Sequence, residues 1–529
     1  MINPSENTNT LISRYKKWHQ SLQPEAGVTT IHVDEVASRV AAFYEKIRGI
    51  IDWKEEHLLK RRAIERTLKR RLFVEQGNEI AESLVLELIR GGHFPNDRIP
   101  ESKIEEVQKA INKYIFILDK TTYNKEKSKI QLYSWISAIA ACEIEEILSP
   151  SIRERALINY MFEVIDKKIK VSEKIKIDEK EKKIQTYIAV QRALFNLDSF
   201  AISYHLLKYR YSGWKDIKEA DLINVAQNIF SLKNNLEADL NHHLGDKFYQ
   251  ICEKYDTSFL LLGDILSENP TEAKERLSDP ELLETLVTAQ YNKRLKTLKK
   301  RLGRAGFYST LSIFLTNIVS LLLIEIPFNK VFTGYFFNTL AIVVDILAPT
   351  ILMFLLVVTI KPPNKENLPR VLMEVMKIVY DKDKKDIYEI KKYKKINAVF
   401  EAIVKLFYFL GFLIILGLIA WGLSKVNFPP LSYVIFIIFL SLIAFAGSKI
   451  KQRAKELQII EEKETILHFF IEPFSIPIIQ LGKWLTGKWE KYNIIAVFFS
   501  ALIDMPFTIF IEFIEQWRYY LKEKKEKIH

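Results

Sequence analysis

Four long apolar runs dominate the second half of the chain. They cover residues 305–328, 335–360, 398–423 and 431–447. A helix rises about 1.5 Å per residue, so about 20 apolar residues are needed to cross the ~30 Å hydrocarbon core of a bilayer. The first three runs reach this length and the fourth lies at its lower limit. The pattern predicts a polytopic α-helical membrane domain with four spanning helices, arranged as two hairpins over 305–360 and 398–447.

The part of the chain before these runs shows a different pattern. Apolar residues recur there every three or four positions, as one face of a helix requires. Two examples are the series Ile130, Tyr133, Ile136, Ala140 and the series Ile184, Tyr187, Val190, Leu194. No segment alternates between apolar and polar residues as a half-buried strand would. The sequence therefore predicts an all-α protein, with an all-helical domain over 31–280 preceded by a mobile polar tail over 1–30.

Basic residues are distributed unevenly between the loops that join the apolar runs. The connections after the first and third runs carry only Lys330 and Lys425, whereas 361–397 and the segment after 447 are rich in lysine and arginine. Basic loops remain on the cytoplasmic side of a membrane. The chain also has a net charge of +12 and only two cysteines, which suits a reducing compartment beside phosphates. We therefore predict a multi-pass cell-membrane protein whose helical domain and both termini are cytoplasmic.

A basic helix is predicted over residues 281–304, directly before the first apolar run. One face is apolar, and the last turns crowd together basic residues with no acid among them. Such a cluster attracts anionic lipid, at about 1 kcal/mol per residue near the surface. The predicted lipid-contacting residues are Lys293, Arg294, Lys296, Lys299, Lys300, Arg301 and Arg304. A bilayer with anionic lipids is thus the first predicted partner.

Two regions outside the four runs are also amphipathic or apolar. The basic loop 361–397 contains an amphipathic helix over 368–380, which either lies on the membrane or docks on the helical domain. In the region 448–529, Glu472 and Asp504 each precede a proline inside an apolar segment. This pattern is typical of discontinuous membrane helices. We predict two proline-broken re-entrant or interfacial segments and a basic cytoplasmic tail, with two further spans as the alternative.

Acidic residues within the apolar runs require an explanation, because a carboxylate at the centre of a membrane helix costs about 2.5–3.5 kcal/mol. Asp345 precedes Pro349 by four residues, so the proline leaves the carbonyl of residue 345 without its helical donor. Carbonyl and carboxylate could then form a small-cation or proton site, or Asp345 could bond a neighbouring helix. Glu325 is expected to reach outer water or Lys330. The predicted pathway comprises Asp345, Pro349, Glu325, Glu472 and Asp504.

Two clusters in the helical domain were considered as sites. The basic stretch from Lys60 to Arg71 could contact phosphates of lipid or nucleic acid, or form a solvated face balanced by acids such as Glu65. Asp239 and His243 are helical neighbours, but no second cluster completes a metal site, so a surface helix is favoured. Nucleotide-binding and metalloprotease motifs are absent from the sequence. We predict no catalytic residues, metal or cofactor.

The predicted function follows from the predicted location of the polar residues outside the apolar runs. Most of these residues are cytoplasmic, the outer loops are short, and catalytic motifs are absent, which favours a membrane-anchored scaffold or tether and not an enzyme. Its helical domain would bind a protein, a lipid surface or nucleic acid. The alternative is an oligomeric channel or transporter for a small cation or proton. The predicted partners are lipids and either a second copy of the chain or a cytoplasmic protein, with nucleic acid as a further alternative.

Overall fold

The chain is almost wholly helical. The computed structural model describes residues 2–22, 27–35, 38–41, 58–74, 79–123, 126–211, 213–333, 339–380, 387–391, 398–459, 466–491 and 505–526. Within these residues the only strands are β1 (Ile169–Val171) and β2 (Tyr388–Ile390). The prediction of an all-α protein is confirmed.

The helices fall into two groups along the sequence. Those before the apolar runs are α1 (Glu6–Ser21), α3 (Leu59–Val74), α4 (Ala81–Arg90), α5 (Ser102–Lys120), α6 (Glu126–Leu148), α7 (Ile152–Lys168), α8 (Glu179–Phe195), α9 (Ser199–Arg210), α10 (Glu219–Gln227), α11 (Ile229–Leu240), α12 (Gly245–Glu268) and α13 (Ala273–Ser278). The later ones are α14 (Pro280–Ser320), η2 (Leu321–Glu325), α15 (Ile326–Phe328), η3 (Asn329–Thr333), α16 (Thr339–Thr359), α17 (Asn367–Tyr380), α18 (Ala398–Ser424), α19 (Pro430–Ala454), α20 (Ile466–Lys491) and α22 (Met505–Glu526).

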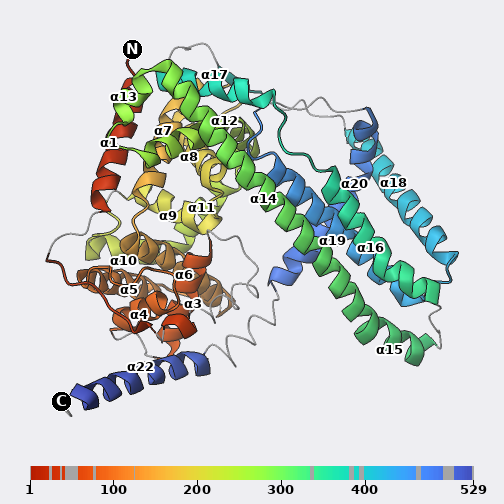
Figure 1. The fold of residues 1–529 in the computed structure, drawn as a ribbon, viewed down its shortest axis with the longest axis horizontal. Helices are drawn as coiled ribbons and strands as arrows, with labels where there is room; N and C mark the ends of the chain where they lie inside the picture. The colour runs from red at the N-terminus through yellow and green to blue at the C-terminus, as the bar shows by residue number, and fades with distance from the viewer. Residues whose placement is uncertain are drawn as a thin grey trace.

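Helix α14 connects the two regions of the molecule. We use the name helical part for the described helices from α1 to α13, the first half of α14, and α17 with β2, which pack together. Figure 1 shows α14 running from this helical part, at the left, into the group of apolar helices at the right. It begins at Asp279, whose carboxylate accepts hydrogen bonds from the backbone amides of Glu281 and Leu282, with Pro280 in the first turn. Both features favour a helix start. Its first half packs on α12 and α13, and its second half packs on α16 and α19.

The helical part contains two separate hydrophobic cores. The first core is formed by α3–α6 and α9–α11 with two residues of α8, and its fully buried side chains include Ile111, Ile139 and Leu206. All its described residues lie between positions 31 and 240, before the apolar runs, although α7 inside this range belongs to the second core. Amphipathic helices of this kind gain most of their stability from burying their apolar faces together.

The second core is assembled from distant parts of the chain. It contains residues of α1, α7, α8, α12, α13 and the first half of α14. It also contains α17 and β2, which lie between the second and third apolar helices, and Leu457 and Ile459, which follow α19. The second core therefore includes segments far beyond the predicted domain boundary at residue 280.

The predicted mobile tail over 1–30 is also wrong, because residues 6–21 form α1. Ser5 caps this helix by accepting a hydrogen bond from the Thr8 amide at 3.3 Å. Leu11, Ile12 and Tyr15 are buried in the second core. The segment is mostly polar, but its few apolar residues share one helical face, and that spacing outweighs the composition.

Helix α17 and strand β2, which lie between the second and third apolar helices, pack on the other helices of the helical part. Val371, Val375 and Val379 of α17 are fully buried against α12 and α14, so this amphipathic helix docks on the protein. Further along, β2 pairs in parallel with β1, with Ile169 opposite Tyr388 and Val171 opposite Ile390. The predicted helix over 368–380 is confirmed. It packs on other helices of the helical part, which is one of the two locations predicted for it.

Among the residues that the structure describes, four helices are long and apolar enough to cross a membrane. They cover Pro280–Phe332, Thr339–Thr359, Val399–Ser424 and Pro430–Ala454, which makes the chain a candidate multi-pass membrane protein. The second half of α14 packs with α16 and α19 as a group that we call the apolar bundle. Gly306 lies against Val357, and Gly447 lies against Leu356, so closely that a Cβ atom at either glycine would collide with its neighbour. Small residues permit such close helix packing in membranes.

The two helices of the predicted second hairpin, α18 and α19, do not pack against each other along their full length. Helix α18 meets α19 only over a short distance, and α20 packs against both of them. Gly482 of α20 lies on the backbone of Ser441, where a side chain would not fit. Helix α18 therefore occupies the outer edge of this group, with most of its apolar side chains exposed (Figure 1, cyan).

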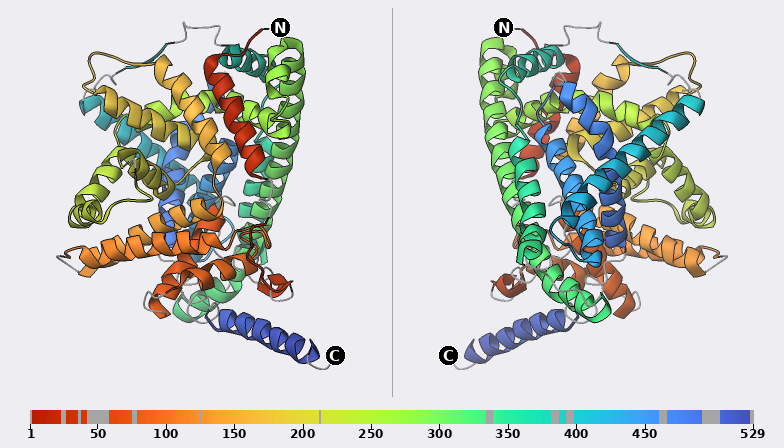
Figure 2. Two further views of the ribbon diagram at one scale, coloured as in Figure 1. Left: turned by 90° about the vertical axis from the view of Figure 1, so that its left-hand side faces the viewer. Right: turned by 90° about the vertical axis from the view of Figure 1, so that its right-hand side faces the viewer.

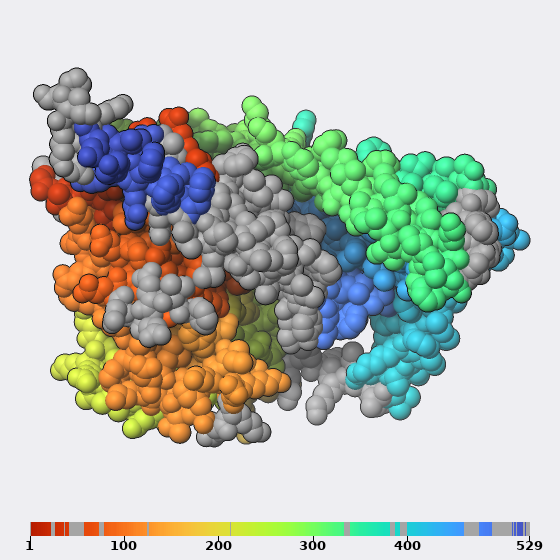
Figure 3. All heavy atoms as spheres, turned by 90° about the horizontal axis from the view of Figure 1, so that it is seen from below, coloured from red at the N-terminus to blue at the C-terminus, as the bar shows by residue number. Residues whose placement is uncertain are grey.

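The two predicted proline-broken segments are ordinary helices in the residues that the structure describes. Helix α20 continues through Pro473 and Pro477, although each proline removes a helical hydrogen bond and crowds the preceding turn. Helix α22 starts at Met505, so Pro506 lies in its first turn. Ile511 packs on Ala41, and Arg518 forms an ion pair with Asp34 at 3.1 Å, so α22 attaches to the helical part (Figures 2 and 3).

Candidate functional site

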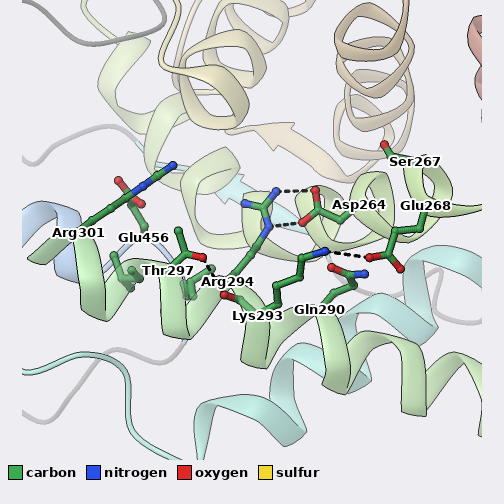
Figure 4. A pocket seen from close by; sticks show the side chains of 11 residues that line it. Asp264, Ser267, Glu268, Gln290, Lys293, Arg294, Thr297, Arg301 and Glu456 are labelled. Atoms are coloured by element: carbon green, nitrogen blue, oxygen red, sulfur yellow. Dashed lines mark hydrogen bonds and ion pairs between the residues drawn. The ribbon is translucent and has the colours of Figure 1, made fainter. Parts of the chain in front are cut away.

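A polar pocket of about 400 Å³ lies where the helical part meets the apolar bundle. Its walls come from α12, from α14 and from the residues directly after α19. Figure 4 shows the side chains that line it converging from these three elements. They are Asp264, Ser267, Glu268, Gln290, Lys293, Arg294, Thr297, Leu298, Arg301, Glu456 and Leu457. Most of these side chains are charged or polar, unlike the largely apolar lining of typical small-molecule sites.

Two ion pairs join α12 to α14 across this pocket. Arg294 holds the Asp264 carboxylate with Nε and Nη2, and Lys293 Nζ lies 3.0 Å from Glu268 Oε1. Hydrogen bonds from Gln290 and Lys293 hold the pKa of the Glu268 carboxyl below its usual value. The sequence shows no acid near these cations along the helix, because the acids come from the preceding helix and fold back beside them.

The remaining basic residues of the predicted lipid-contacting cluster are exposed on α14. Among the residues that the structure describes, none forms an ion pair with Lys296, Lys299, Lys300, Arg301 or Arg304. Of these, only Arg301 also lines the pocket. The seven predicted residues therefore divide into two that bind α12 and five that face outward.

A buried asparagine fixes the chain segments around the pocket to one another. Asn367 of α17 donates to Tyr291 Oη at 3.0 Å and to the carbonyl of Leu457 at 2.6 Å. Its own side-chain oxygen accepts from the amide of Ile459 at 2.9 Å. Close by, Thr257 of α12 donates to the carbonyl of Glu456 at 2.9 Å. The segment after α19 is thus hydrogen-bonded to the helical part, which the sequence pattern did not reveal.

Glu325 occupies a buried position in the apolar bundle. It ends the π-helical turn η2 and is only 1% exposed, so the prediction that it reaches outer water is wrong. Ser320 donates to Glu325 Oε1 at 3.2 Å, and Ser432 of α19 donates to Oε2. The π-helical turn allows the carboxylate to face α19, where two hydroxyl donors replace water. Such turns occur often at functional sites.

Pro349 leaves the backbone carbonyl of Asp345 without a helical donor, and this carbonyl has a partner on another helix. It accepts a hydrogen bond from the Asn317 side chain of α14 at 3.2 Å, which joins the first two apolar helices. The Asp345 side chain is 4% exposed and lies within electrostatic range of the Glu325 carboxylate. The structure thus brings together Glu325, Asp345 and Pro349 from the predicted pathway. Glu472 lies in α20 but its side chain is not described, and Asp504 lies outside the described residues.

The basic stretch in α3 is mostly an internal network. Arg61 is 2% exposed and pairs with Asp198 of α9 and with Glu65, at 3.6 Å from the latter. Arg71 pairs with Glu87 of α4 at 2.9 Å. These cations hold helices of the first core together, which removes them from any phosphate-binding surface.

The histidine pair of the helical part is bound to its neighbours in a similar way. His242 Nε2 lies 3.0 Å from Glu181, and Asp239 pairs with Arg210. The rings of His242 and His243 lie 4.3 Å apart. Within the described ranges, no group of three histidine, cysteine, aspartate or glutamate side chains is placed to hold a metal ion.

Comparison with known proteins identifies no relative. No family model, no curated protein and no solved structure matches the chain. The candidate sites are therefore defined by the molecule's own geometry: the polar pocket between α12 and α14, and the buried carboxylates of the apolar bundle.

Proposed function

We propose that the chain is a membrane-anchored scaffold whose helical part and both termini are cytoplasmic. The observation that carries this proposal is the composition of the second core. It takes α17 and β2 from between two apolar helices, and Leu457 and Ile459 from after a third. A domain attached at several points has a fixed position relative to the membrane, which a single flexible linker could not give.

The charge distribution supports the proposed orientation. The second core includes α17 and β2, which follow α16, and the residues directly after α19. Both of these chain segments are basic. Loops with this composition remain on the cytoplasmic side. The five outward-facing cations of α14, which include Lys296 and Arg304, would then lie at the level of the headgroups and contact anionic lipid.

The scaffold proposal is tested by cross-linking in intact membranes. Apolar side chains that are exposed on the helical part, such as Ile130 at 66% and Tyr209 at 53%, are suitable positions for a photoactivated cross-linker. We expect one defined protein, or a second copy of this chain, to be captured at these positions. Matched cross-linkers on the lipid-facing side of α18, for example at Leu406, should not capture it. Absence of any reproducible product from the helical part contradicts the scaffold.

A second candidate function is a pathway for a small cation or proton through an oligomer. Asp345 favours it, because this acidic residue is 4% exposed within the apolar bundle, in electrostatic range of Glu325, and its backbone carbonyl accepts a hydrogen bond from Asn317. Reconstituted vesicles should then show a flux that Asp345→Asn abolishes. Glu401→Gln is the matched control, because Glu401 is exposed at the start of α18 and pairs with Lys405. Wild-type vesicles that show no flux under a proton or cation gradient exclude this function.

A further inference from the structure

The exposed face of α22 is aromatic. Phe510, Phe513, Trp517 and Tyr520 are each about half exposed, with values between 50% and 57%. They follow one another at intervals of three and four residues, so they form a single stripe along the helix, which we call the aromatic stripe. The rings of Phe513 and Trp517 stack with centroids 6.2 Å apart. No described helix covers this stripe.

A different face of α22 is attached to the helical part. Ile511 is 4% exposed and packs on Ala41, and Arg518 Nε lies 3.1 Å from Asp34 Oδ2. These two residues lie on the same side of the helix, about a third of a turn away from the aromatic stripe. With this face attached to the helical part, the stripe remains exposed. In Figure 1, α22 lies at the lower edge of the helical part.

The chemistry of the stripe matches the boundary between headgroups and acyl chains. Tryptophan and tyrosine are enriched there, because one end of each ring system is apolar and the other forms hydrogen bonds. Lys524 Nζ lies over the Tyr520 ring, 5.5 Å from its centroid, which adds a cation to the C-terminal end of the stripe. The sequence after Trp517 adds further lysines, which attract anionic headgroups at about 1 kcal/mol each.

We propose that α22 lies in the cytoplasmic headgroup layer of the same bilayer that the apolar helices cross, with its aromatic stripe inserted. This inference rests on the proposed membrane anchoring. The spanning helices hold the helical part beside the bilayer, so the stripe meets lipid without a separate binding event. The helical part then has a second contact with the membrane, through α22, besides the basic end of α14.

The test uses the full chain in vesicles of phosphatidylethanolamine and phosphatidylglycerol that contain lipid with a nitroxide on its headgroup. An environment-sensitive fluorophore is attached at Trp517→Cys or at Phe513→Cys. Tyr519→Cys is the matched control, because Tyr519 is 73% exposed but lies off the stripe. Both natural cysteines are buried, so labelling is directed to the new thiol. We expect quenching of roughly half of the fluorescence at 513 and 517, and little at 519, because only the stripe enters the headgroup layer.

A fluorophore at Leu406→Cys on α18 distinguishes failure of this inference from failure of membrane anchoring. Quenching by nitroxides on the acyl chains at 406, without any headgroup quenching at 513 and 517, overturns the proposal for α22 alone. Loss of quenching at all positions overturns the anchoring as well. Energy transfer between labels at 517 on two copies, with no lipid quenching, shows that the stripe is covered by a second copy and also overturns the inference.

Discussion

The two cores of the helical part differ in which segments of the chain form them. Every described residue of the first core lies between positions 31 and 240, before the apolar helices, whereas the second also takes residues from between and after them. The first can therefore form as soon as this part of the chain is complete. The second is completed only when Leu457 and Ile459 are in place, so its formation depends on correct placement of three apolar helices. Non-local contacts of this kind form late, because the intervening chain must first be ordered.

The comparison is tested most strongly by placing a charge in the second core. Val375 of α17 is fully buried, and Val375→Asp should destabilise the second core by at least about 4 kcal/mol, because an unpaired carboxylate would be buried. Hydrogen exchange on the full chain in detergent micelles measures the effect separately in each core. We expect loss of protection in α12 and retention of protection in α5.

Met373→Asp is the matched control for this substitution. Met373 lies two residues away on the same helix but is 55% exposed, so the same charge meets water there. Its exchange pattern should equal that of the natural chain. Equal loss of protection in both cores of the Val375→Asp protein would show that the two cores form one cooperative unit, against the comparison.

A smaller effect is expected from removing the asparagine that holds the segment after α19. Asn367→Ala deletes three hydrogen bonds, to Tyr291, Leu457 and Ile459, at a cost of about 3 kcal/mol. Exchange of the amides in 455–459 should accelerate before the first core changes. Asn364→Ala, at an exposed position three residues earlier, is expected to leave these amides unchanged.

The smallest effect concerns acid sensitivity of the first core. Burial lowers the pKa of His205 from 6.5 to about 4. The unfolded chain therefore takes up a proton at a higher pH than the folded chain does. Stability is fully present above pH 6.5 and is lost as the pH falls towards 4, with about 2 kcal/mol lost between pH 7 and pH 5. Between pH 7 and pH 5, the free energy of unfolding of the natural chain should therefore fall by about 2 kcal/mol more than that of His205→Gln. An equal fall in the two proteins contradicts the assignment.

The sequence predicted those features that depend on neighbouring residues. Hydropathy located the four apolar helices, and Pro349 indicated a carbonyl at Asp345 without a helical donor. The donor itself, Asn317, could not be found, because it lies on another helix. The same limit explains the partners of Arg294 and Arg61, since Asp264 and Asp198 approach only after the chain folds. The tail over 1–30 was misjudged because average polarity concealed a single buried face.

The central claim is that α17, although it lies between two apolar helices, shares a core and a membrane side with the N-terminal helices. Labelling of single cysteines in intact cells with a membrane-impermeant maleimide tests it directly. The natural cysteines are buried, which keeps the background low. We predict that Lys330→Cys is labelled from outside, and that Met373→Cys is labelled only after the membrane is permeabilised. Labelling of Met373→Cys in intact cells, at the rate seen for Lys330→Cys, would contradict the account.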